Sequence, residues 1–140
     1  MIYVDTSVLV ALYVNETGSR AVDRWYSACT EELVSSAWCV TEFASALGIK
    51  QRTGELDEAA ALVAWQQFER LCANDLQLLT IDPSTYHRAA ILALEAGSCL
   101  RAGDALHLAI AHDSKAVSMA TLDKVLAKNA KRHGIMAIKF

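Results

Sequence analysis

Short β-prone runs alternate with longer helical patterns along the whole chain, and this alternation restricts the fold more than any other feature of the sequence. The expected strands cover residues 2–4, 33–37, 76–81, 116–121 and 136–140. The expected helices cover residues 7–14, 19–28, 39–52, 56–73, 83–96, 101–112 and 124–133. Strands that recur between helices are typical of a parallel sheet covered by helices on both faces. We therefore expect an α/β fold.

Length and composition are those of a single globular domain. A chain of 140 residues with 54% hydrophobic side chains can bury a sizeable core, and no linker or repeat divides it, so we expect residues 1–140 to form one domain. No apolar run approaches the roughly 18 residues of a membrane span. The N-terminal MIYVDTSVLV lacks the basic start and cleavage site of a signal peptide, so we expect a cytoplasmic protein without membrane contact.

The four cysteines are widely spaced and form no CxxC pair. We expect all four to be reduced thiols and not a zinc site or a disulfide framework. They are Cys29, Cys39, Cys72 and Cys99.

The formal net charge is −3, but the charge is unevenly distributed. Residues 114–140 contain six Lys and Arg side chains against one Asp. These basic side chains could meet nucleic-acid phosphates, or they could simply be solvated helix and strand positions. Charge alone does not decide whether nucleic acid is a partner. The side chains in question are Lys124, Lys128, Lys131, Arg132 and Lys139.

The segment 101–112 reads as a helix that is apolar on nearly every face, which is typical of a helix in a protein interior. It nevertheless carries Asp104 in its first turn, where an unpaired buried carboxylate is costly. Arg101 is the one local cation that could pair with Asp104. A bound cation would serve better, because several carboxylates around one cavity are what hard divalent metals bind.

Three further acids follow expected strands. Asp5 ends the first strand, Glu42 lies in the first turn after the second strand, and Asp123 follows the fourth. Each has a structural alternative, as a helix cap or as a charge at the positive end of a helix. Because the carboxyl ends of parallel strands share one edge of the sheet, where ligands bind, we expect the three to lie together. Asp104 follows a helix, so spacing alone does not place it at that edge.

Other acids have simpler explanations. Asp82 also follows a strand, but Pro83 behind it indicates a helix cap followed by proline at the first helical position. Asp57 and Glu58 begin a helix that follows another helix, so we expect them at the opposite end of the molecule.

Four segments of the chain resemble the acidic motifs of the PIN-domain nucleases, and more narrowly those of the VapC-like toxins of toxin–antitoxin pairs. They are MIYVDTSVLVALY, TEFASAL, LRAGDALHLAIA and ATLDKVLAKNAKRHGI. The likeness spans the whole chain in the right order, and all four acidic positions are present. It implies a three-layer α/β/α sandwich with a parallel sheet of four to five strands in the order 3-2-1-4-5. In that order Asp5 and Asp123 lie on neighbouring strands, and Asp82 is remote.

The resemblance also implies a function. It implies a metal-dependent endoribonuclease that hydrolyses RNA and acts as a toxin that inhibits translation or growth. It also implies a small VapB-like antitoxin as partner and a homodimeric state. One or two Mg²⁺ or Mn²⁺ ions would offset the repulsion among the acids and supply the reactivity. The residues expected to be catalytic and to bind the metal are Asp5, Glu42, Asp104 and Asp123.

Several neighbouring side chains have two possible roles each. The hydroxyl groups of Thr6, Ser7 and Thr121 could hold a metal-bound water or a phosphate, or could cap the adjacent helix. Arg101 and Lys124 are candidates for phosphate contact. We expect His107 to be packed between helices and not to bind the metal, because hard cations prefer oxygen.

The alternatives to a toxin are a PIN-type nuclease of RNA maturation or decay, and a PIN-like module that binds without cleaving. A phosphotransfer fold that uses strand-end aspartates is disfavoured, because Asp5-Thr6-Ser7 lacks the second acid two residues on. We also expect the three tryptophans to pack against helices and not to stack on bases. They are Trp25, Trp38 and Trp65.

Overall fold

The computed structural model describes residues 1–140 and contains one five-stranded sheet in the order β3-β2-β1-β4-β5. Every neighbouring pair of strands is parallel, as the alternation of strands and helices predicts. The strands are β1 (Ile2–Val4), β2 (Leu33–Ser36), β3 (Leu76–Leu79), β4 (Ser118–Ala120) and β5 (Met136–Ala137). The expected strand order is therefore confirmed.

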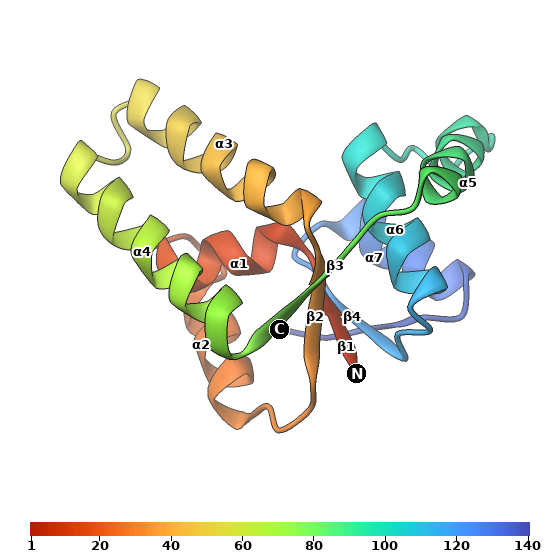
Figure 1. The fold of residues 1–140 in the computed structure, drawn as a ribbon, viewed down its shortest axis with the longest axis horizontal. Helices are drawn as coiled ribbons and strands as arrows, with labels where there is room; N and C mark the ends of the chain where they lie inside the picture. The colour runs from red at the N-terminus through yellow and green to blue at the C-terminus, as the bar shows by residue number, and fades with distance from the viewer.

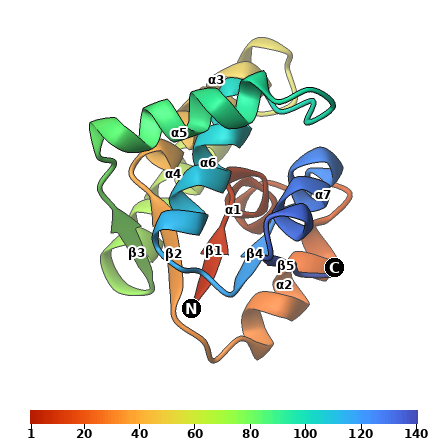
Figure 2. The ribbon, with the colours of Figure 1, turned by 90° about the vertical axis from the view of Figure 1, so that its right-hand side faces the viewer.

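Seven helices cover the two faces of the sheet, which confirms the expected three-layer sandwich. The helices are α1 (Thr6–Tyr13), α2 (Ser19–Ala28), α3 (Trp38–Arg52), α4 (Glu58–Asn74), α5 (Pro83–Leu94), α6 (Ala102–Asp113) and α7 (Lys124–Arg132). Figures 1 and 2 show α1 to α4 on one side of the sheet and α5 to α7 on the other. None of the seven combines the length and the apolar character that crossing a lipid bilayer demands.

The central strand β1 supplies both hydrophobic cores, because successive side chains of a strand point to opposite faces. Ile2 and Val4 pack into the core under α1, α3 and α4. Tyr3 packs into the core under α6 and α7 and is fully buried. As a result β1 is fixed from both sides, and the residue that follows it is held in a rigid position.

Helix α6 has a long uninterrupted buried run. Every residue from Ala105 to Ala111 is buried, as the almost uninterrupted apolar sequence predicts. Its first turn carries Asp104. The interior position of this helix, and the carboxylate at its start, are both confirmed.

Element ends differ from the sequence expectation in two places that matter. Helix α3 begins at Trp38 because Ala37 already has helical backbone angles, so Glu42 lies in the second turn and not in the first. Strand β5 has two residues instead of five, and it pairs only with Ser118 and Met119 of β4 at the edge of the sheet. The four cysteines are free, and no disulfide is present.

Candidate active site

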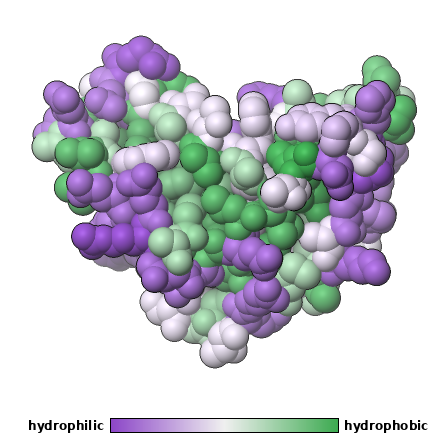
Figure 3. All heavy atoms as spheres, viewed as in Figure 1, coloured by the Kyte–Doolittle hydropathy of each residue, from purple (hydrophilic) through white to green (hydrophobic).

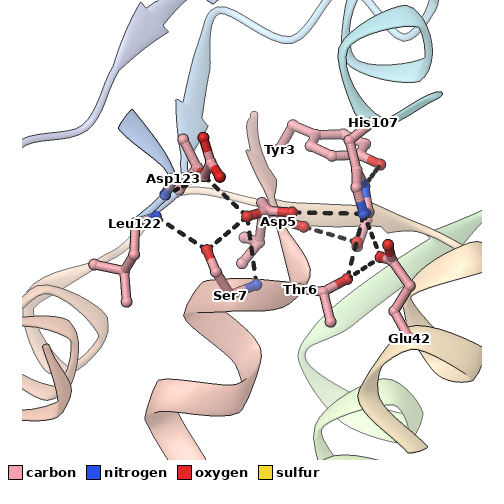
Figure 4. A network of polar contacts seen from close by, with 11 residues as sticks. Tyr3, Asp5, Thr6, Ser7, Glu42, His107, Leu122 and Asp123 are labelled. Carbon is pink, nitrogen blue, oxygen red and sulfur yellow. Dashed lines mark hydrogen bonds and ion pairs between the residues drawn. The ribbon is translucent and has the colours of Figure 1, made fainter. Parts of the chain in front are cut away.

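Asp5 is the residue that leaves β1 and enters α1. Its side chain caps α1 by accepting a hydrogen bond from the Ser7 backbone N–H at 3.4 Å. The same oxygen, Oδ2, accepts from the hydroxyl groups of Ser7 at 2.6 Å and Thr121 at 2.9 Å. Figure 4 shows these contacts converging on Asp5. The carboxylate is buried and held by three donors.

Asp123 lies on the neighbouring strand end, as the pairing of β1 with β4 requires. Its Oδ1 caps α7 by accepting from the Leu126 backbone N–H at 2.8 Å. Its own backbone N–H donates to Thr121 Oγ1 at 3.0 Å, so the Thr121 hydroxyl links Asp123 to Asp5. The helix-cap role of Asp5 and Asp123 is therefore real, and each cap uses one carboxylate oxygen and leaves the other for further contacts.

Glu42 reaches the same edge from the second turn of α3. Its Oε2 accepts a hydrogen bond from Thr6 Oγ1 at 2.5 Å and lies 2.5 Å from His107 Nε2. Burial alone would raise the pKa of this carboxyl, but the contacts with His107 and Thr6 outweigh burial and hold the pKa below its usual value. Glu42 is therefore an ionised carboxylate at neutral pH.

Asp104 completes the group from the first turn of α6, and it makes no hydrogen bond or ion pair with any side chain. Burial and the charges of Asp123 and Asp5 raise the pKa of Asp104 above its usual value, and Glu42 adds to the effect. The close approach of α6 to α3 depends on Gly103, where a Cβ atom would lie 2.9 Å from Glu42 Oε1. Thus the structure brings together all four acids expected at this edge.

No lysine or arginine neutralises this acidic cluster, which we define as Asp5, Glu42, Asp104 and Asp123. The Lys and Arg side chains that form ion pairs pair with other acids. Arg101, the local cation that could have paired with Asp104, is exposed and forms no ion pair with it. Lys124 is also exposed, at the first position of α7. The repulsion within the cluster is therefore uncompensated apart from one histidine.

That histidine, His107, is the main site residue that sequence reasoning underestimated. It is buried between elements, as expected, but its Nε2 lies 2.5 Å from Glu42 Oε2 and 3.5 Å from Asp5 Oδ1. Hydrogen bonding to Glu42 and the charge of Asp5 raise its pKa, although its burial alone would lower it. The available signal was the spacing, since residues three apart on a helix share a face and His107 is three residues after Asp104.

The remaining sequence predictions are met in part. Thr6, Ser7 and Thr121 use their hydroxyl groups to bind carboxylates of the cluster. Trp25 packs edge-on against Phe140, and Trp65 packs against phenylalanines of the core, whereas Trp38 is partly exposed at the start of α3. Asp82 is exposed at the end of β3, the outermost strand, at the capping position before Pro83.

The donor set of the cluster suits a hard cation. It consists of carboxylate oxygens from four separate elements, and each of the four acids has at least one oxygen without a hydrogen bond. Hard divalent ions such as Mg²⁺ take oxygen ligands of this kind. As the side chains stand, no three of the His, Cys, Asp and Glu groups are close enough together to hold an ion between them. The chemistry of the cluster fits a metal, and binding one requires its side chains to move closer together.

Comparison with known proteins agrees with this architecture. A family model described as PIN domain matches residues 2–132. The crystal structure of Mycobacterium tuberculosis VapC20, described as a sarcin-ricin loop cleaving toxin, is 16% identical, with a TM-score of 0.75 over 92% of this chain and 95% of that chain. FitAcB from Neisseria gonorrhoeae is 21% identical, with a TM-score of 0.71 over 99% and 97%. PAE2754 from Pyrobaculum aerophilum is 25% identical, with a TM-score of 0.70 over 97% and 82%. No curated protein matches the sequence.

Proposed function

We propose, given that this chain belongs to the PIN domain family, that it is a metal-dependent endoribonuclease that hydrolyses the phosphodiester bonds of RNA. The observation that carries the proposal is the acidic cluster, in which four carboxylates from distant parts of the chain meet without a lysine or arginine. A cluster of this kind is poorly tolerated unless cations bind to it. The unit proposed to act is the single domain of residues 1–140, and its place of action is the cytoplasm.

Each residue of the cluster has a proposed role in holding Mg²⁺ or Mn²⁺. Asp5, Glu42, Asp104 and Asp123 are the proposed ligands of one or two ions. When bound, such ions supply an activated water for attack on the phosphorus and stabilise the leaving oxygen. The protein contributes orientation: three hydroxyl groups, those of Thr6, Ser7 and Thr121, fix the carboxylates of Asp5 and Glu42.

The RNA is proposed to enter from the side on which α3 and α6 begin. Figure 3 shows that the outline of the molecule is notched between the α3–α4 pair and the α5–α6 pair. Arg101 and Lys124 are exposed at the first turns of α6 and α7, beside Asp104 and Asp123, and we assign them contacts with RNA phosphates.

Within this activity, we propose that the protein is the toxin of a toxin–antitoxin pair. The fold shared with VapC20, whose description is that of a toxin, and with FitAcB supports this assignment. A small antitoxin that blocks the acidic cluster and a second copy of the chain are the proposed partners. Exposed apolar side chains on α4 and α5 support protein contacts. They are Leu62, Val63, Tyr86, Ile91 and Leu94.

The nuclease is tested by incubating the purified protein with total RNA in Mg²⁺, in Mn²⁺ and in EDTA. We expect cleavage with either metal, none in EDTA, and recovery when metal is restored in excess. Asp5→Asn should abolish cleavage without loss of the helix cap, since Asn caps as well as Asp. Asp82→Asn is the matched control, because it removes an exposed carboxylate outside the cluster and should cleave like the wild type. Cleavage that persists in EDTA, or in Asp5→Asn, would contradict the proposal.

The toxin assignment is tested separately by induced expression. We expect wild-type protein to arrest growth and Asp5→Asn to leave growth unaffected. Co-expression of a small protein encoded beside this gene should relieve the arrest. Metal-dependent cleavage without any effect on growth would instead favour a nuclease of RNA maturation or decay.

A further inference from the structure

A chain of contacts links the hydrophobic core to the acidic cluster through two buried aromatic side chains. Tyr3 Oη lies 2.7 Å from His107 Nδ1, and both side chains are almost completely inaccessible to solvent. At the other side of the imidazole, Nε2 lies 2.5 Å from Glu42 Oε2 and 3.5 Å from Asp5 Oδ1. Figure 4 shows His107 between Tyr3 and the two carboxylates.

The contacts determine which imidazole nitrogen carries a proton. Nε2 faces two carboxylates, which only accept hydrogen bonds, so Nε2 must be a donor. In the neutral ring Nδ1 is then an acceptor, and the Tyr3 hydroxyl supplies the hydrogen bond that this tautomer needs. Tyr3 and Glu42 therefore bind opposite nitrogens of His107 and fix the ring between them.

The ring of His107 has little freedom to turn away from Glu42. Tyr3 and His107 pack edge to face, with ring centroids 5.7 Å apart and an angle of 68° between the planes. Tyr3 lies on β1, the central strand, and His107 lies in the buried run of α6. Two rigid elements thus hold the imidazole against Glu42, whose side chain is longer and less buried.

Glu42 needs such support more than the other three acids of the cluster. Asp5 and Asp123 are held as helix caps, and Asp104 has a short side chain on a buried helix. Glu42 has a longer side chain with 26% of it exposed, and repulsion from the charge of Asp104 favours its turning outward. Thr6 and His107 both bind its Oε2, at 2.5 Å each, and Trp38 is a further hydrogen-bond partner of the side chain.

We propose that His107, held on its other side by Tyr3, is a positioning residue that keeps the Glu42 carboxylate in place for the cation and is not itself a metal ligand. The inference rests on the proposed function, because it assumes that the cluster binds a divalent ion. Partners that orient a ligand in this way are known to change metal affinity by about 10- to 100-fold when they are removed.

The test is a calorimetric titration of Mn²⁺ into RNA-free protein, with four chains: wild type, His107→Leu, Glu42→Gln and the double variant. We expect His107→Leu to weaken Mn²⁺ binding about 10-fold in the wild-type background. In the Glu42→Gln background the same substitution should have little further effect, because the carboxylate on which it acts is gone. A merely structural histidine would weaken binding by the same factor in both backgrounds, and that result would overturn the proposal.

Two further variants keep the test decisive if His107→Leu does not fold. His107→Gln retains an amide donor on the Glu42 side and should keep most of the affinity. Tyr3→Phe removes only the hydroxyl group and should weaken Mn²⁺ binding by less than His107→Leu. Affinity unchanged in Tyr3→Phe and lost in His107→Gln would overturn the proposal, as would tighter binding in His107→Leu, which would mean that the imidazole competes with the cation.

The failure of this proposal differs from the failure of the proposed function. If wild-type protein binds no Mn²⁺ and cleaves no RNA, both fall. If wild-type protein binds Mn²⁺, Glu42→Gln weakens that binding and His107→Leu does not, the nuclease stands and the role of His107 falls alone.

Discussion

At the scale of single residues, the acids at this edge show that a structural role and a functional role are compatible. Asp5 and Asp123 cap helices and also belong to the acidic cluster, because a carboxylate has two oxygens and a cap needs one. Asp104 differs from them, since no donor in the protein binds it. Asp104 is therefore the residue at which the loss of stability caused by four neighbouring charges is most directly measurable.

Replacing Asp104 by Asn separates catalysis from stability. Burial and the charges of Asp123 and Asp5 raise the pKa of Asp104, so the folded state favours the protonated carboxyl. Its stabilising contribution is present at acid pH and is lost as the pH rises through the raised pKa. We therefore expect metal-free Asp104→Asn to melt at the same temperature as wild type or higher at pH 7, with no advantage at acid pH. Cleavage should fall by about 100-fold or more, the size typical for loss of one preorganised electrostatic contact.

Thermal melts in EDTA at several pH values, together with RNA cleavage assays, measure both effects. Melts with excess Mg²⁺ provide the comparison, because a bound cation should stabilise wild type more than the variant. A marked destabilisation of the metal-free variant at pH 7 would show that Asp104 has a structural partner and is not an uncompensated charge.

At the scale of helices and strands, the placement of the site depends on where α3 and α6 begin. The sequence predicted that both helices exist, but it placed the start of α3 one residue too late, because helical backbone at Ala37 leaves no mark in the sequence. It could not place the start of α6 beside α3, since that depends on packing between segments 60 residues apart. Gly103 was the one local indication, because it leaves room for Glu42 where any Cβ atom would intrude.

Two glycine-to-alanine substitutions test this close approach. Gly103→Ala and Gly48→Ala both replace glycine within a helix, which by itself stabilises a helix by about 0.5–1 kcal/mol. At Gly48 the new Cβ would meet only the mobile end of Arg52 at 3.3 Å, so we expect that stabilisation in full. At Gly103 it would lie 2.9 Å from Glu42 Oε1 and displace the carboxylate, so RNA cleavage should fall.

Chemical denaturation measures the first effect, and cleavage rates at saturating Mg²⁺ and at limiting Mg²⁺ measure the second. The larger deficit is expected at limiting Mg²⁺, since the displaced group is a proposed ligand. If Gly103→Ala cleaves RNA as fast as Gly48→Ala at both concentrations, the contact between α6 and Glu42 does not matter for the site.

At the scale of the whole molecule, much of the fold was predictable and part of the site was not. Alternation of strands and helices predicted a parallel sheet, and the resemblance to PIN-domain nucleases implied its order. The polar network around the acids was not predictable, since Tyr3 and His107 read as core residues and are core residues. Their second role arises only because β1 and α6 pack together, and sequence spacing carries no information about that contact.

The packing of the core on the α1–α4 side predicts which substitutions in α4 destabilise the protein. Phe43 of α3 and Phe68 of α4 stack with ring centroids 4.2 Å apart, and both are buried. We expect Phe68→Ala to lower the free energy of unfolding by about 3–5 kcal/mol, through lost burial and the cavity left behind. Leu62→Ala on the same helix is the control, because Leu62 is 55% exposed and should change stability by about 0.5 kcal/mol or less. Urea unfolding of both variants checks this, and equal effects would mean that α4 does not form part of the core.

The strand order also determines when the acidic cluster can form during synthesis of the chain. A ribosome adds Thr121, which meets Asp5 across β1 and β4, 116 residues after Asp5, and it adds Asp123 later still. Until β4 has been synthesised and has paired with β1, no shorter nascent chain can assemble this group of charges. A ribosome that makes this chain is therefore not exposed to the assembled charges while only the first three strands have been added.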